Sequence, residues 1–328
     1  MDVEEKDLLK TLSKEGANIK DIQKSIRTVK RLAENEPLTN LYKIKQEVVK
    51  IEKTLKQSKL DEFVKEGIEQ HIQQVKLKIP EWEEKTKKSF GQRLEQTLQQ
   101  LGFELKGHYP TLKVSFYTLK IDLDNNNIEI WYGPEQEKLD SSKLIPETIA
   151  QKLKYAHAQI TQRQFDDNTF LSSLYDAYRV AVYRNDGKIG DAAPITAVLS
   201  NLAFLIQSRD FKKNPTKSNY RDYGRVFFSY DLYRLTERRI ENLELSLISA
   251  TRAYTRRRSD FLWIPSNEKG GGNYISHIKF REREQETNYR HRLTQINTDE
   301  KSNAVSPAQQ IKEKISVNPC LKQKEVIL

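Results

Sequence analysis

Cysteine is almost missing from this chain of 328 residues, and several other features are scarce or absent. The single cysteine, Cys320, excludes an internal disulfide framework and any thiolate-rich zinc site. No apolar run approaches the roughly 20 residues of a membrane span. The acidic first residues lack the cationic and apolar regions of a signal peptide. These absences predict a protein of a reducing compartment, the cytoplasm.

Sequence motifs for catalysis are missing as well. The five histidines show no metal-ligand spacing, and the chain has no ATPase phosphate-binding loop, serine-hydrolase elbow or dinucleotide fingerprint. Asp122 and Glu129 lie near a turn, as metal-binding nuclease carboxylates do, but Trp131 stands where a lysine is expected. The sequence therefore predicts no catalytic residue, metal or cofactor, and keeps a metal-dependent nuclease only as the weakest alternative.

Charged residues, in contrast, are abundant. They make up 31% of the chain, and 56 Lys and Arg against 46 Asp and Glu give a formal net charge of +10. The mean hydropathy of −0.76 predicts a modest core with long, solvated helices. The positive excess favours acidic partners, and nucleic acid ranks ahead of an anionic membrane because no basic amphipathic helix adjoins a lipid anchor.

The first hundred residues follow a heptad pattern. Apolar residues three and four positions apart form one seam over 19–33 and another over 41–55. A third apolar segment ends before Pro80, and a fourth spans 82–101. Because each seam covers only about two heptads, an intramolecular antiparallel bundle or a protein-docking arm is favoured over a long coiled-coil rod.

Beyond Gly102 the apolar period changes from 3.6 to 2. Residues 103–106, 111–122 and 128–132 predict strands of a small antiparallel sheet, with a turn at 124–127. The aromatic residues of these strands are expected to pack beneath helices, with stacking on nucleic-acid bases as an alternative. They are Phe116, Tyr117, Trp131 and Tyr132.

Helical periodicity returns after the sheet. Residues 146–160, 168–183 and 194–207 predict helices, and the nearly continuous apolar character of the last one makes it the central core helix. Pro194 suits the first turn of that helix, where its missing amide hydrogen is not needed.

Residues 233–258 predict one long helix with two faces. At about 100° per residue, Arg238, Arg252 and Arg256 fall on one face, and leucine, isoleucine and alanine residues gather on the other. A β-hairpin with a glycine-rich tip follows over 261–280. A helix followed by a hairpin is the outline of a winged helix.

The cations predicted to contact phosphates lie on that helix, in the loop before it and at the hairpin tip. They are Arg238, Arg239, Arg252, Arg256, Lys212, Lys213, Lys217, Arg221, Arg225 and Lys269. Three alternatives stay open: an ordinary solvated loop, arginines that stabilise the end of the helix, and internal ion pairs with Asp231 or Glu241.

The predicted fold class is mainly α with a small antiparallel β component (α+β), in three parts. Residues 1–101 form a helical-hairpin or coiled-coil arm, and residues 102–284 form a mixed domain with a winged-helix-like C-terminal part. That domain holds the sheet (103–132), the helices (146–207), the basic helix and the hairpin. Residues 285–328 read as a polar tail.

These patterns predict a non-catalytic accessory subunit that contacts nucleic acid, DNA ahead of RNA. We expect a bacterial multi-protein assembly for DNA processing or defence against foreign DNA, in which a separate ATPase or nuclease supplies the chemistry. The N-terminal helices are expected to bind the other subunits. A structural adaptor that docks acidic proteins through the arm and the arginine face is the alternative.

Overall fold

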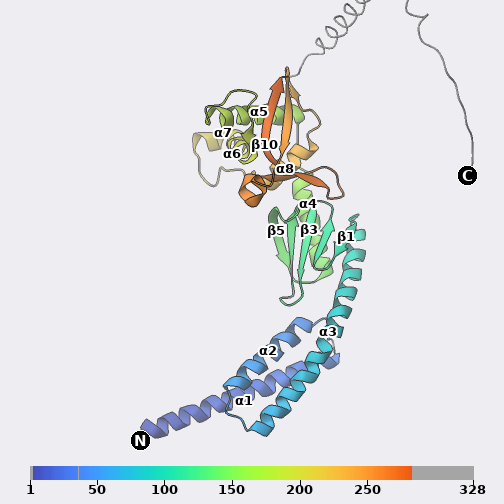
Figure 1. Ribbon diagram of the computed structural model, residues 1–328, viewed down its shortest axis with the longest axis vertical. Helices are drawn as coiled ribbons and strands as arrows, with labels where there is room; N and C mark the ends of the chain where they lie inside the picture. The colour runs from blue at the N-terminus through green and yellow to red at the C-terminus, as the bar shows by residue number, and fades with distance from the viewer. Residues whose placement is uncertain (1–2, 36, 283–328) are drawn as a thin grey trace, which may run out of the picture. The chain divides into compact units, whose positions relative to one another are not determined.

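The computed structural model describes residues 3–35 and 37–282, which form a mixed α+β structure, as the sequence predicts (Figure 1). It has two β-sheets, where the sequence predicted one sheet and a hairpin. The predicted tail, 285–328, lies outside the described residues, and the predicted domain limits stay predictions. None of the described helices combines the length and apolar character needed to cross a membrane.

The secondary-structure elements follow one another in three groups. The first group holds the helices α1 (Val3–Asn35), α2 (Leu41–Gln57) and α3 (Glu62–Gln99). The second holds β1 (Leu105–His108), β2 (Thr111–Val114), β3 (Tyr117–Asp122), β4 (Asn127–Tyr132), β5 (Glu137–Ser142) and α4 (Pro146–Thr161). The third holds α5 (Asp167–Tyr183), β6 (Ala193–Pro194), α6 (Ile195–Leu205), α7 (Arg209–Lys213), α8 (Arg225–Arg234), β7 (Arg239–Ile240), β8 (Leu243–Ser249), the 3-10 turns η1 (Tyr254–Arg256) and η2 (Arg258–Asp260), β9 (Leu262–Pro265) and β10 (Gly272–Glu282).

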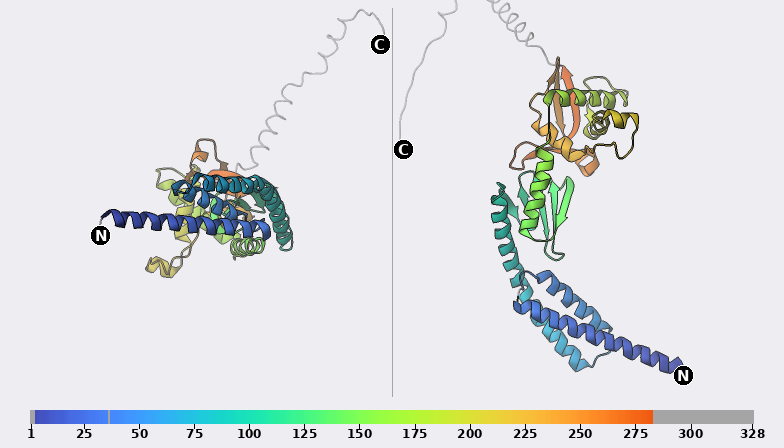
Figure 2. Two further views of the ribbon diagram at one scale, coloured as in Figure 1. Left: turned by 90° about the horizontal axis from the view of Figure 1, so that it is seen from below. Right: turned by 180° about the vertical axis from the view of Figure 1, so that it is seen from behind.

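The helices α1, α2 and α3 pack on one another through the heptad residues. Figure 2 shows α2 lying beside α1. Their shared core is made of buried aliphatic residues from all three helices: Ile22, Val29, Ile44, Val48, Ile51, Leu55, Ile72 and Val75. The helices and their contacts therefore agree with the sequence, while the coiled-coil interpretation of this arm stays a prediction.

One boundary in this region was wrongly predicted. A helix was predicted to end before Pro80, but α3 continues through that residue to Gln99. A proline inside a helix removes one hydrogen bond and costs about 3 kcal/mol. Packing offsets this cost, because α3 buries Ile72 and Val75 on one side of the proline and Leu94 and Leu98 on the other.

The first sheet is an antiparallel meander in the order β1-β2-β3-β4-β5. The run predicted as one strand over 111–122 is two strands, since Ser115 adopts a left-handed conformation (φ 48°) in the turn between them. Asn126 (φ 49°) occupies the predicted turn at 124–127. The ends of α3 and α4 cover the sheet and share its core, to which Leu94 and Leu153 contribute.

The second sheet has the order β6-β10-β8-β7, and β9 pairs with β10. Its core includes the buried faces of α5, α6 and α8. Pro194 was expected in the first turn of α6, but it lies directly before that helix and belongs to β6. The hairpin predicted over 261–280 is present, because residues 262–265 pair with residues 272–275.

The long helix predicted over 233–258 is absent from the structure. The helix α8 ends at Arg234, and the strands β7 and β8 follow, joined by a tight turn in which Glu241 is left-handed (φ 53°). Leu243 and Leu245 are buried while Glu244 between them is exposed, which is the period-2 pattern of a strand. The helical wheel masked this alternation, and the winged-helix prediction loses the helix on which it was based.

Candidate nucleic-acid interface

Nine of the ten cations predicted to contact phosphates have exposed side chains: Arg238, Arg239, Arg252, Arg256, Lys212, Lys213, Lys217, Arg221 and Lys269. Arg238, Arg252 and Arg256 were expected on one helix face, but that helix is absent, and Arg238 lies apart from the other two. The structure brings six of the nine, together with Arg257, to two segments beside α6, and places the other three elsewhere.

The first segment, residues 251–260, is called the arginine loop below. Its sequence contains four arginines and one aspartate. Its turn η2 contacts α6, and the ring of Tyr254 meets His277 edge-on at 4.9 Å between centroids. Just before the loop, the amide of Ala250 donates to the carbonyl of Tyr274 at 2.7 Å. Packing at several points therefore holds the backbone of a segment whose side chains are mostly solvated.

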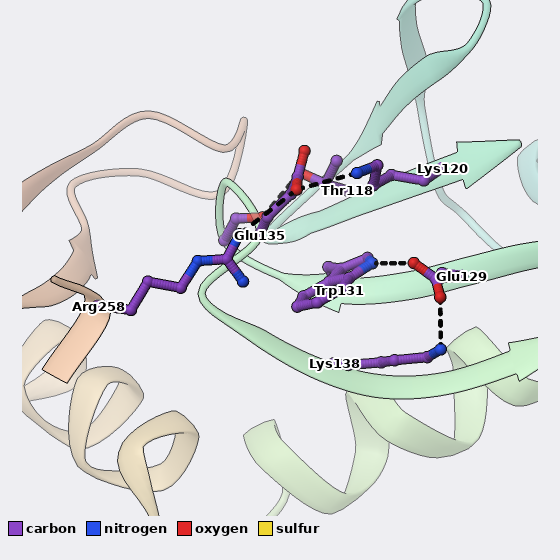
Figure 3. A network of polar contacts seen from close by, with 8 residues as sticks. Thr118, Lys120, Glu129, Trp131, Glu135, Lys138 and Arg258 are labelled. Carbon is purple, nitrogen blue, oxygen red and sulfur yellow. Dashed lines mark hydrogen bonds and ion pairs between the residues drawn. The ribbon is translucent and has the colours of Figure 1, made fainter. Parts of the chain in front are cut away.

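Arg258 fixes the arginine loop to the first sheet. Its guanidinium group lies 5.4 Å from the ring centroid of Trp131, and its Nη2 lies 3.6 Å from Glu135 (Figure 3). Arg252, Arg256 and Arg257 have no ion pair within the described part of the chain. These three guanidinium groups are therefore open to an external anion.

The second segment, residues 208–222, is called the lysine loop below. Its sequence contains five Lys and Arg residues and two aspartates. Buried Gln207 closes it through two reciprocal bonds: its Nε2 donates to the carbonyl of Arg221, and its Oε1 accepts from the amide of Arg221, both at 2.9 Å. The ring of Phe211 packs between Phe204 and Tyr220. No sequence signal marked Gln207 as the residue that orders this loop.

The cations of the lysine loop extend into solvent from this framework. Lys212 donates from Nζ to the carbonyl of Leu205 at 2.6 Å. Lys213, Lys217 and Arg221 are exposed, and no ion pair involves them among residues 3–35 and 37–282. Because α7 follows α6 directly and η2 contacts α6, both loops adjoin the same helix.

Arg225 is the one predicted phosphate contact whose side chain is mostly buried, with 21% of it exposed. Its Nε lies 2.6 Å from Glu137, and its Nη2 donates to the carbonyls of Arg258 and Phe261 at 2.6 and 2.7 Å. Burial lowers the pKa of this guanidinium group, and Glu137 opposes that shift. Arg225 therefore binds groups of its own chain and holds the arginine loop to α8 and β5.

Arg238 and Arg239 lie away from the two loops. They come before the N-terminal end of β8 in the chain, and the arginine loop comes after its C-terminal end. Seven strand residues at about 3.3 Å each separate these ends by about 23 Å. Asp231, expected as their partner, instead contacts two other arginines.

Lys269 lies at the tip of the hairpin, and this tip is packed. Asn267 accepts hydrogen bonds from the amides of Lys269 and Gly271. Gly270 has a φ of +85°, and a Cβ atom there would lie 2.5 Å from the carbonyl oxygen of Ser115, so only glycine fits. The tip therefore docks on the turn between β2 and β3.

A cleft of about 420 Å³ lies beside the hairpin tip. Lys269, Lys106 and Lys113 line it together with aromatic residues that include Phe116 and His157. Burial lowers the pKa of His157, opposed by Glu268, and its Nδ1 lies 3.1 Å from the Tyr117 hydroxyl. Lys269 thus adjoins two further lysines that the sequence analysis did not select.

The aromatic residues of the first sheet pack inside the protein, as expected, and do not form a surface for stacking on bases. Phe116, Tyr117 and Tyr132 are at most 3% exposed, so they cannot present a ring face to a base. Trp131 is partly exposed, but its Nε1 donates to Glu129 at 3.0 Å and Arg258 covers its ring.

The two carboxylates considered for nuclease chemistry have partners within the chain. Glu129 accepts from Lys138 at 2.5 Å as well as from Trp131 (Figure 3), and the Lys138 bond lowers the pKa of Glu129. Asp122 accepts from the side chain and the amide of Asn125, and the side-chain bond lowers its pKa. Among the described residues, no group of three or more His, Cys, Asp or Glu is arranged to hold a metal ion.

Asp231 was considered as a partner of Arg238 and Arg239, but the buried ionic cluster that it forms with two other arginines was not predicted. Asp231 is 3% exposed, and its Oδ1 lies 2.6 Å from Arg163 and 2.7 Å from Arg234. The hydroxyl of Tyr223 donates to its Oδ2 at 2.8 Å, and burial raises the pKa of that tyrosine. The ring of Phe227 lies 4.3 Å from the Arg163 guanidinium. This cluster joins the end of α4 to α8.

No protein-family model, curated protein or solved structure matches the chain.

Proposed function

We propose that this protein is a non-catalytic accessory subunit that contacts nucleic acid, DNA ahead of RNA, through the arginine and lysine loops beside α6. The observation that supports this most is the set of guanidinium and ammonium groups on two backbone-anchored loops. Eight of them have no ion pair among the described residues, three in the arginine loop and five in the lysine loop: Arg252, Arg256, Arg257, Arg209, Lys212, Lys213, Lys217 and Arg221.

The physical basis is the sequence-independent attraction between such groups and phosphates. Each cation that neutralises a phosphate releases condensed counterions, so affinity falls as salt rises. A surface with charges on ordered loops loses less conformational entropy on binding than one on a disordered segment. Both loops are fixed within the chain, by Gln207 in one case and by Arg225 and Arg258 in the other.

The test is the salt dependence of binding, measured by fluorescence anisotropy with labelled single-stranded and duplex DNA and RNA. Replacing Arg252, Arg256 and Arg257 with alanine removes up to three phosphate contacts. We expect the slope of log affinity against log salt to become shallower by about 2 to 3 on duplex DNA. Absence of binding at low salt, or an unchanged slope, contradicts the proposal.

A matched control is available at the other end of β8. Replacing Arg238 and Arg239 with alanine removes two exposed arginines that lie beside Leu245 and Glu244, about 20 Å from the arginine loop by the strand rise. If the two loops form the interface, this variant keeps the wild-type slope more closely than the triple variant does.

The adaptor alternative uses the same cations to bind an acidic protein. It predicts that poly-glutamate competes as well as DNA does and that a purified native complex carries proteins but no nucleic acid. The proposed assembly predicts retained nucleic acid and a separate ATPase or nuclease among the co-purifying proteins.

A further inference from the structure

The lysine loop carries aromatic rings as well as cations. Phe204, near the end of α6, is 58% exposed, and Tyr220, within the loop, is 44% exposed. The partly buried Phe211 packs against both, with its ring centroid 6.3 Å from that of Phe204 and 5.6 Å from that of Tyr220. These three residues, called the ring cluster below, place two exposed rings in a segment rich in cations.

The geometry of the ring cluster leaves ring faces open to solvent. The planes of Phe204 and Phe211 make an angle of 73°, so one ring meets the other with its edge. Such a contact covers at most one face of a ring, and more than half of Phe204 stays exposed. Phe116 of the first sheet differs, because it is 3% exposed and presents no face. Phe204 and Tyr220 are therefore accessible to a planar ligand.

A cation accompanies each of the two exposed rings. The Nζ of Lys212 donates to the carbonyl of Leu205, the residue after Phe204, at 2.6 Å. Arg221 directly follows Tyr220 and is exposed. Neither Lys212 nor Arg221 has an ion pair within the part of the chain that the structure describes. The surface therefore offers aromatic faces and positive charge side by side.

These two features match the two parts of a nucleotide, its base and its phosphate. In a duplex the bases stack on one another, whereas unpaired bases expose faces on which aromatic side chains stack. We infer that the lysine loop binds a single-stranded stretch of nucleic acid. Phe204 and Tyr220 stack on unpaired bases, and Lys212 and Arg221 contact the phosphates beside them. This inference rests on the proposed function and deepens it by naming the form of nucleic acid that the loop takes.

The ring cluster is ordered before any ligand binds. Gln207 holds both the amide and the carbonyl of Arg221 at 2.9 Å, which fixes the backbone next to Tyr220. Phe211 lies between the two exposed rings and sets their separation. A strand that binds here loses its own freedom but does not have to order the loop, so the stacking contributes more fully to affinity.

The experiment measures the affinity of the full chain for a labelled oligothymidine strand of about 20 nucleotides and for a duplex of the same length. The double variant Phe204→Ala with Tyr220→Ala should bind the strand at least about 10-fold more weakly, and the duplex within about threefold of the wild type. Phe204→Tyr with Tyr220→Phe keeps both rings and should keep the affinity. Phe63→Ala, at a position 82% exposed on α3, is the matched control and leaves strand binding unchanged.

A change in the ligand tests the same contacts without altering the protein. A strand of abasic sites keeps the phosphates and lacks the bases, so the wild type should bind it about as weakly as the alanine variant binds oligothymidine. An alanine variant with wild-type affinity for the strand overturns the inference. Equal, salt-dependent binding of the strand, the duplex and the abasic strand also overturns it, and leaves the proposed function standing. Binding to none of the three at low salt contradicts the proposed function and this inference together.

Discussion

Two groups of arginines in this protein have the same chemistry and opposite surroundings. Arg163 and Arg234 are 18% and 15% exposed and share one buried carboxylate, Asp231. Arg252 and Arg256 are exposed and have no ion pair in the described residues. The first group joins elements of the fold, and the second leaves its charge available to a partner, so the position of the counter-charge decides the role of each arginine.

The largest effect is expected from removing the shared carboxylate. Asp231→Ala leaves two mostly buried guanidinium groups and the Tyr223 hydroxyl without their acceptor. Such an uncompensated buried charge costs about 3–5 kcal/mol of unfolding free energy. Urea denaturation measures this loss, and Asp222→Ala, an exposed neighbour, is the control. A loss below about 1 kcal/mol contradicts the role of the cluster.

Arg225 stands between the two groups and should show an intermediate effect. Arg225→Ala removes the partner of Glu137 and the donor to two carbonyl groups. We expect a loss of about 1–3 kcal/mol, since buried acceptors lose their hydrogen bonds. Arg221→Ala, four residues earlier and exposed, should change stability by less than about 0.5 kcal/mol and weaken nucleic-acid binding instead. Equal stability losses in both variants contradict the comparison.

Replacing the exposed arginines should separate binding from stability. The Arg252, Arg256 and Arg257 triple alanine variant should unfold within about 0.5 kcal/mol of the wild type, because its side chains have no ion pair to lose among the described residues. The same protein should show the shallower salt slope on DNA. Thermal or urea denaturation of the purified variant checks the stability, and a loss above 1–2 kcal/mol, on the order of a core substitution, shows that these arginines hold the fold.

The sequence could predict the helices of the arm and most of the first sheet because their apolar residues follow regular periods. It did not predict β5, whose sequence contains one apolar residue. It failed over 233–258, where Leu243 and Leu247, four residues apart, fit one face of a helix and one face of a strand equally well. Leu245, which is buried beside Leu243 in the strand, fits only the strand, and Glu241 begins a turn without a glycine or proline signal. This failure placed Arg238 beside Arg252 on one helix face, whereas the structure sets them at opposite ends of β8.

The sequence indicated which cations are exposed, but it did not indicate which arginines have an ion-pair partner inside the fold. Exposed lysines and arginines were selected because of local charge density, and most of them are exposed. Arg163 and Asp231 are 68 residues apart in the chain and meet only because α4 and α8 pack together. No local pattern encodes such a contact, which is also why the internal role of Arg225 was missed.

The smallest effect is expected for the pH dependence of stability, through His157. Burial favours the neutral form of this side chain. Burial lowers the pKa of His157 below its ordinary value of 6.5, while Glu268 opposes the shift. Above pH 6.5 the imidazole is neutral in both the folded and the unfolded chain. As pH falls through that value, the unfolded chain binds the proton more readily, so stability decreases.

We therefore expect the midpoint of urea denaturation to fall from pH 7.5 to about 5.5, and His157→Gln to flatten part of this decrease. His108→Gln, at an exposed position, is the control and should keep the wild-type pH profile. His277, whose pKa burial also lowers, adds a decrease of the same sign that persists in the His157 variant. A midpoint that rises on acidification means that carboxylates such as Glu268 outweigh the desolvation of His157, because a protonated imidazole is then stabilised in the folded state.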